Sequence, residues 1–134
     1  MANCLIVTNV LILLLAYPDV IAVVGSDVSL PCNVSRIRSD NVTLILWYRS
    51  DDMISGPPIY SVDARSTSSL DLSKAIHFTP ESMSSKAKFD LTVRPAMLRI
   101  KDVNPLDDGQ YWCRVDYRWT RTTISLIKLN VIGM

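Results

Sequence analysis

The stretch Asp107-Asp108-Gly109-Gln110-Tyr111-Trp112-Cys113 contains the pattern Asp-x-Gly-x-Tyr-x-Cys, and it decides the fold of this chain. Far upstream lie Cys32 and, fifteen residues later, Trp47. In a sandwich of two β-sheets, cysteines on facing strands join the sheets, a tryptophan packs over the disulfide, and a tyrosine two residues before the second cysteine forms a corner. Gly109 suits the tight turn before this tyrosine, where a side chain would crowd the backbone. We therefore expect a Cys32–Cys113 disulfide, with Trp47 packed over it and Tyr111 in the corner.

Short segments in which apolar and polar residues alternate fill most of the remaining chain and are separated by turn-forming residues. They predict an all-β, immunoglobulin-like β-sandwich with Greek-key connections and one inter-sheet disulfide. About sixty residues separate Trp47 from the tyrosine corner, which leaves room for extra strands and favours the variable type, or V-set. Leu98 faces the core in one of the expected strands, which span residues 28–32, 42–49, 59–62, 86–93, 97–101, 110–117 and 123–131.

The N-terminal segment is strongly apolar from Cys4 to Ala16, interrupted only by Thr8 and Asn9. Its length fits the apolar region of a secretory signal peptide and is short for a membrane span. We therefore expect a signal peptide at residues 1–18, followed by one V-type immunoglobulin domain at residues 19–132. Because Lys and Arg are missing before the apolar segment, an uncleaved anchor and a buried strand remain open alternatives.

An extracellular location agrees with the expected disulfide, which needs an oxidising compartment. Two Asn-x-Ser/Thr sequons, at Asn33 and Asn41, are candidate glycosylation sites. With 14 basic and 13 acidic residues, the bulk charge indicates neither nucleic acid nor an anionic membrane as a partner. His77 is the one histidine, and no residue spacing typical of a metal site, a phosphate loop or an activated nucleophile occurs. We therefore expect neither an enzyme nor a bound cofactor or metal.

Alternation in the two central expected strands also assigns side chains to the face of the sheet away from the core. This predicts a partner-binding surface with an apolar, aromatic centre and a charged rim, which is the composition of a protein–protein contact. The alternative is that the segment between residues 63 and 86 folds over the surface and buries it. The centre consists of Leu46, Tyr48 and Trp112, the rim of Arg114, Asp116 and Lys128, and Tyr60 is assigned to the same surface.

Several blocks of the sequence resemble the first immunoglobulin domain of the Sidestep family of neuronal cell-surface receptors. The resemblance covers residues 23–132 and implies axon guidance through binding of a Beaten-path-like immunoglobulin protein on this face. Trp112 replaces the family's usual Arg, and Lys86 replaces an Arg that pairs with the carboxylate at Asp107. The more specific blocks are Pro58-Ile59-Tyr60-Ser61-Val62-Asp63-Ala64-Arg65 and Cys113-Arg114-Val115-Asp116-Tyr117-Arg118. The other two are Leu46-Trp47-Tyr48-Arg49 and Ala75-Ile76-His77-Phe78.

The chain stops just after the last expected strand, so two forms of the protein are consistent with the sequence. One is a piece of a longer, membrane-anchored receptor at the cell surface. The other is a secreted single-domain protein that self-associates, as a homodimer for example, or acts as a soluble decoy.

Overall fold

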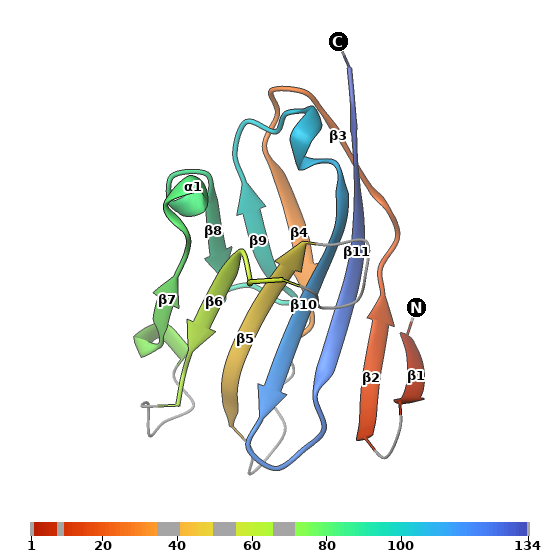
Figure 1. Ribbon diagram of the computed structural model, residues 1–134, viewed down its shortest axis with the longest axis vertical. Helices are drawn as coiled ribbons and strands as arrows, with labels where there is room; N and C mark the ends of the chain where they lie inside the picture. Colours follow the sequence, from red (N-terminus) through yellow and green to blue (C-terminus); the bar gives the residue numbers. More distant parts are fainter. Residues whose placement is uncertain (1, 8–9, 35–40, 50–55, 66–71, 134) are drawn as a thin grey trace.

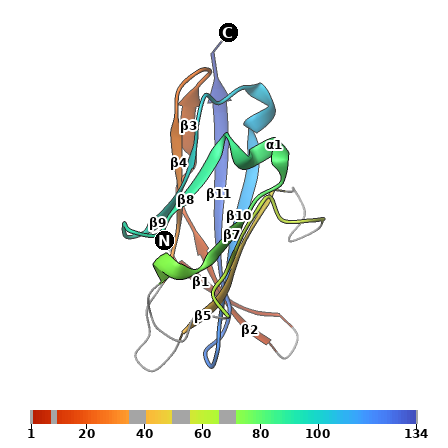
Figure 2. The same cartoon turned by 90° about the vertical axis from the view of Figure 1, so that its left-hand side faces the viewer.

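The computed structural model describes residues 2–7, 10–34, 41–49, 56–65 and 72–133 (Figure 1). Within these residues the chain forms two β-sheets, and the helical segments are short: α1 (Glu81–Ser84) and two 3-10 turns, η1 (Leu72–Lys74) and η2 (Pro105–Asp107). Figure 2 shows β4 and β9 on one side of the molecule and β10 on the other. The prediction of an all-β sandwich is confirmed.

The larger sheet has the strand order β1-β2-β11-β10-β5-β6-β7, and β3 also pairs with β11. The smaller sheet has the order β4-β9-β8, so the strands divide between the sheets as in a variable-type sandwich. The strands of the larger sheet are β1 (Ala2–Val7), β2 (Val10–Ala16), β3 (Val20–Val23), β5 (Val42–Arg49), β6 (Tyr60–Asp63), β7 (Ile76–Phe78), β10 (Gly109–Tyr117) and β11 (Thr123–Ile132). Those of the smaller sheet are β4 (Val28–Cys32), β8 (Ala87–Asp90) and β9 (Ala96–Ile100).

The inner core lies between the sheets and is stapled by the predicted disulfide. Cys32 on β4 and Cys113 on β10 are bonded, with their Cα atoms 5.9 Å apart. Trp47 lies directly beside Cys113 in the β5–β10 register, and its ring meets that of Phe89 edge-on at 5.6 Å. Leu98, Trp47 and both cysteines are fully buried in one cluster, and the predicted disulfide is confirmed.

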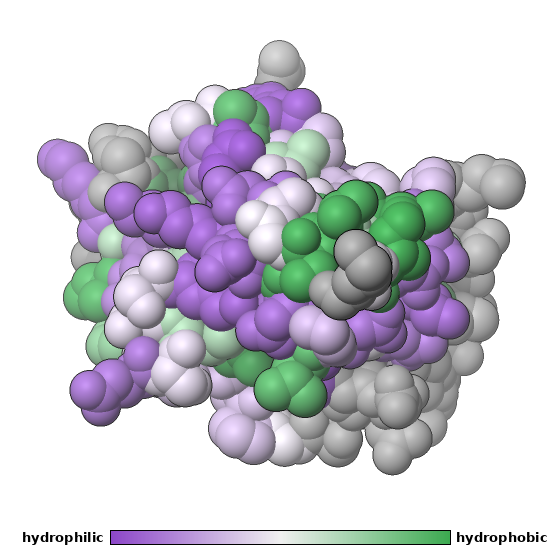
Figure 3. All heavy atoms as spheres, turned by 90° about the horizontal axis from the view of Figure 1, so that it is seen from above, coloured by the Kyte–Doolittle hydropathy of each residue, from purple (hydrophilic) through white to green (hydrophobic). Residues whose placement is uncertain are grey.

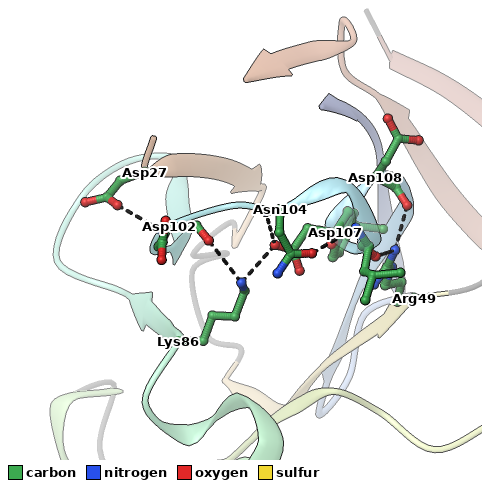
Figure 4. A network of polar contacts seen from close by, with 9 residues as sticks. Asp27, Arg49, Lys86, Asp102, Asn104, Asp107 and Asp108 are labelled. Atoms are coloured by element: carbon green, nitrogen blue, oxygen red, sulfur yellow. Dashed lines mark hydrogen bonds and ion pairs between the residues drawn. The ribbon is translucent and has the colours of Figure 1, made fainter. Parts of the chain in front are cut away.

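The turn before β10 is held by a network of polar contacts (Figure 4). The Tyr111 hydroxyl donates a hydrogen bond to the Asp107 carbonyl oxygen at 2.6 Å, which is the predicted tyrosine corner. Burial raises the pKa of Tyr111 to about 12. Lys86 Nζ lies 2.9 Å from Asp107 Oδ2, so the expected ion pair forms. Arg49 stacks on the Tyr111 ring and donates to the carbonyl oxygens of Leu106 and Asp108, which fixes the turn against β5.

The backbone conformation at Gly109 requires a glycine, whereas the space around the residue does not. Its φ of +146° is rarely adopted by residues with a side chain, whereas an added Cβ would meet the Arg49 guanidinium at an ordinary 3.6 Å. The expectation that a side chain would crowd the backbone here is therefore wrong. Asn104 completes the turn with a capping box: its side chain accepts from the Leu106 N–H, and its own N–H donates to Asp107.

The N-terminal segment lies in the larger sheet as β1 and β2. These strands pair antiparallel with each other, and β2 pairs in parallel with the first half of β11. In the full chain the segment is therefore strand, and its described side chains, those of residues 14–16, are partly buried. This arrangement leaves cleavage untested, so the signal peptide at residues 1–18 stays a prediction.

Candidate recognition surface

The surface of the larger sheet that faces away from the smaller sheet, here called the outer face, is defined by strand register. Trp112 on β10 lies between Tyr48 on β5 and Leu126 on β11. Arg114 lies between Leu46 and Ile124 in the same way. Directly paired residues project to the same side of a sheet, so these side chains share one face, as the alternation predicted.

An apolar cluster occupies the outer face and is separate from the inner core. It consists of Tyr48, Trp112 and Ile124, which are 8%, 7% and 1% exposed, with Leu14, Leu46 and Leu126 packed against it. We call this set the outer-face cluster. The expectation that Tyr48 and Trp112 form an exposed centre is wrong for the full chain, because both side chains are buried. Leu14, which packs there, belongs to the N-terminal strand β2 and not to the segment between residues 63 and 86.

The charged rim lies beside this cluster. Arg114 Nε is 2.9 Å from Asp116 Oδ1, and the same oxygen accepts a hydrogen bond from Thr122 Oγ1 at 2.8 Å. Both ionic side chains are partly exposed, so this pair contributes little to stability. Lys128 is exposed on β11, two residues beyond Leu126. The predicted rim residues therefore border the cluster, with the charges of Arg114 and Asp116 balanced against each other.

Tyr60 is not part of the outer face. It pairs with Trp47 in register, is 5% exposed, and contacts Phe89 in the inner core. Its hydroxyl lies 2.7 Å from His77 Nδ1 on β7. Burial raises the pKa of Tyr60, and partial desolvation of the His77 ring, which meets the Tyr60 ring edge-on on an otherwise exposed strand, lowers the pKa of His77. The assignment of Tyr60 to the partner-binding surface is therefore corrected: it anchors β7 to β6 and fills the core.

A second apolar patch continues the outer face toward the C-terminal end of the domain. Ile21 pairs with Asn130 and Val23 pairs with Ile132, so the side chains of these pairs project to the outer side with Ile124 and Leu126. Ile21, Val23 and Ile132 are 66%, 55% and 52% exposed. Figure 3, which views this end of the molecule, shows apolar side chains gathered within a largely hydrophilic surface.

The two candidate glycosylation residues lie at strand ends. Asn33 follows β4, and its backbone N–H donates to Ser125 Oγ at 3.1 Å. Asn41 precedes β5, and its carbonyl oxygen accepts from the Arg118 N–H. Both residues are partly buried, and Ser35, which completes the first sequon, lies outside the described residues.

Sequence reasoning missed Ile124 and Leu14. Ile124 has the same parity along β11 as Leu126 and Lys128, so strict alternation would have found it. Leu14 gave no such signal, because it lies in a continuous apolar run with no polar alternation. Among the described residues no group of acidic, His or Cys side chains could hold a metal ion, and no helix is long and apolar enough to cross a membrane.

Comparison with known proteins places this geometry in a family. The family model for the immunoglobulin V-set domain matches residues 17–132. The chain belongs to the immunoglobulin V-set family. This V-set chain is 33% identical over 121 residues to butyrophilin-like protein 2 of Mus musculus, covering 85% of the chain and 24% of that protein. The chain thus spans about a quarter of this curated relative.

Solved structures share the fold of this V-set chain at low sequence identity. The crystal structure of murine CEACAM1b superimposes with a TM-score of 0.62 at 14% identity, over 84% of this chain and 50% of that one. A structure from photo-crosslinking work on multimeric cell-adhesive interactions of VGSC beta subunits gives a TM-score of 0.62 at 18% identity, covering 89% and 93%. These likenesses establish the architecture.

Proposed function

We propose that this V-set domain is an extracellular recognition domain that binds another immunoglobulin-superfamily protein through its outer face. The observation that carries the proposal is the outer-face cluster, in which Tyr48, Trp112 and Ile124 lie outside the inner core. These side chains do not join the two sheets, so packing between the sheets does not account for them. Buried aromatic anchors surrounded by a polar rim are typical of binding hot spots.

The proposal contains no catalytic step. A V-set sandwich is a recognition framework, and cell-adhesion molecules are among the structures that share it. The disulfide favours an oxidising, extracellular environment. Carbohydrate at Asn33 or Asn41 forms part of the same proposal.

The more specific form of the proposal is a Sidestep-like receptor domain that binds a Beaten-path-like immunoglobulin protein. Its support is the sequence block Cys113-Arg114-Val115-Asp116-Tyr117-Arg118, which supplies two of the three rim charges of the outer face, Arg114 and Asp116. The identity to a butyrophilin-like protein supports the broader assignment to the immunoglobulin superfamily and favours no particular partner.

A binding screen of the secreted protein against immunoglobulin-superfamily ectodomains, with Beaten-path-type proteins included, tests both levels of the proposal. We expect Trp112→Ala and Tyr48→Ala each to weaken a specific interaction by about 2 kcal/mol, which is about thirtyfold. Lys88→Ala, an exposed position on β8 in the opposite sheet, is the control and should leave binding unchanged.

The variant Trp119→Ala distinguishes binding through the outer face from binding through the connection between β10 and β11. Trp119 is 77% exposed in the connection between β10 and β11. A loss of binding with Trp119→Ala and none with Trp112→Ala would move the contact from the outer face to this connection. Binding by non-Beaten-path proteins alone would retain the recognition domain and reject the Sidestep-like assignment.

Self-association through the outer face, as a homodimer or a soluble decoy, is the second candidate. The observation in its favour is the additional apolar patch of Ile21, Val23 and Ile132 on the same face. Gel filtration with light scattering distinguishes the two: a stable dimer that Val23→Asp dissociates supports self-association, and a monomer that binds another chain supports the receptor domain.

A further inference from the structure

One edge of β11 is shared by two separate segments of the N-terminal region. The first half of β11 pairs in parallel with β2, with Leu14 beside Ile124 and Ala16 beside Leu126. The second half pairs with β3, where Val20 lies beside Leu129. The Tyr17 N–H donates to the Leu126 carbonyl oxygen at 3.1 Å, which continues the hydrogen bonds of β2 to the end of that half.

The same register places an apolar side chain of β2 on the outer face. Leu14 is the direct neighbour of Ile124 and packs against the outer-face cluster, in which Ile124 is 1% exposed. The β2 strand therefore supplies the two components of strand-addition binding: main-chain hydrogen bonds to a sheet edge and a side chain that fills an apolar site.

We propose that the β11 edge at Thr123–Leu126 and the outer-face cluster form a binding site for an extended apolar segment. In the full chain the segment is the chain's own Val10–Ala16, which covers the recognition face until it is removed or displaced. The expected effect of β2 on partner binding rests on the proposed function, whereas the occupancy of the site by β2 rests on the strand pairing alone.

Two features allow β2 to leave without disturbing the rest of the domain. The inner core, among the side chains whose burial is described, draws its members from Tyr17 onward, so the described side chains of β2, those of Leu14, Leu15 and Ala16, lie outside it. Pro18 lies between β2 and β3 and is exposed; it has no N–H to continue the ladder, so the two pairings are separate. Loss of residues 1–16 should therefore free the first half of the β11 edge and leave the second half paired.

Hydrogen exchange tests this directly within a single strand. The full chain, refolded without passing through secretion so that residues 1–16 remain, is compared with the chain that begins at Tyr17. We expect amide protection to fall about tenfold or more within residues 123–126 of the shorter chain. Protection at residues 129–132, which pair with β3 in both forms, is the internal control and should not change. Equal protection at residues 123–126 in both forms would overturn the proposal.

A disulfide trap tests whether the segment lies on its own β11. In a Cys4→Ser background, Leu14→Cys with Ile124→Cys places two cysteines at directly paired positions, within reach of a disulfide. The matched control is Leu14→Cys with Lys128→Cys on the same strand, about 13 Å further along and too far to bond. A disulfide within one chain supports the proposal. A disulfide-linked dimer, or no bond in the folded protein, overturns it.

Partner binding distinguishes failure of this proposal from failure of the proposed function. Using the partner identified in the screen, we expect the full chain to bind at least about tenfold more weakly than the chain that begins at Tyr17. Equal binding by both forms would overturn the proposal that Val10–Ala16 covers the outer face, while the proposed recognition function would stand. If neither form binds any partner, the proposed function fails, and the exchange and disulfide results decide the occupancy of the site.

Discussion

Removal of the Cys32–Cys113 disulfide should cost the domain most of its stability. The bond joins positions 81 residues apart, and the chain-entropy relation for a loop of that size gives about 4.5 kcal/mol at 25 °C. Domains of this kind have total stabilities of about 5–15 kcal/mol. Both cysteines are fully buried, so the lost sulfur packing adds to the entropic cost.

The double variant Cys32→Ala/Cys113→Ala is the appropriate perturbation because it leaves no unpaired thiol in the core. Urea unfolding, followed by tryptophan fluorescence, should show the midpoint lowered by about 2 M or more, or no folded baseline at all. Cys4→Ser, which leaves the disulfide intact, is the matched control. In secreting cells, we expect Cys113→Ser alone to abolish export of folded protein.

Two outcomes would refute this reasoning. The first is a double variant whose free energy of unfolding lies within about 1 kcal/mol of the wild-type value, which would show that the unfolded chain gains little freedom without the bond. The second is normal secretion of monodisperse Cys113→Ser protein. Either result would mean that the packing of Trp47 and its apolar neighbours holds the two sheets together without the Cys32–Cys113 disulfide.

Two further predictions concern the turn before β10. Tyr111→Phe should lower the free energy of unfolding by about 1–3 kcal/mol, because the Asp107 carbonyl oxygen loses its buried donor. Burial raises the pKa of Tyr111 to about 12, so between pH 10 and 12 this tyrosine deprotonates mainly in the unfolded chain. The free energy of unfolding of the wild type should therefore fall by about 2–3 kcal/mol over this range, and the variant should lack this loss. Lys86→Met should cost about 2–3 kcal/mol by leaving the Asp107 carboxylate without its cation, and Lys86→Met/Asp107→Asn should recover part of that stability. Equal alkaline unfolding of wild type and Tyr111→Phe, or no recovery in the double variant, would contradict these assignments.

The strands that the sequence predicted best carry inward-facing apolar side chains at alternate positions. Residues 28–32 and 42–49 were expected as strands and form β4 and β5 with the same ends. In β4 the buried side chains alternate with less buried ones, which gives the period of two that marks a half-buried strand. In β5 the alternation is confined to residues 45–47, because Tyr48 on the outer face is also buried. The disulfide and the tyrosine corner were predictable for a related reason: each depends on particular residue types at a fixed spacing.

The strands that were missed carry no such period. All three residues of β7 are exposed, so hydrophobic alternation gives no indication of it. The β3 strand consists of four consecutive apolar residues next to the apolar N-terminal segment and has no polar residue to mark its faces. Tyr60 was misassigned because parity within β6 is fixed only by the register with β5, which places Tyr60 beside Trp47.

The residues of the outer face were predicted correctly, but Tyr48 and Trp112 were expected to be exposed and are buried. This difference has a physical cause. Alternation specifies to which side of the sheet Tyr48 and Trp112 project, but it carries no information about which other segment lies on that side. An aromatic cluster in water is unfavourable, and the nearest apolar segment able to extend the sheet is β2, whose Leu14 reaches the cluster from the β11 edge. A partner that binds this face must therefore replace the contacts that β2 makes. The affinity of the outer face for any partner should thus depend on whether Val10–Ala16 is still attached.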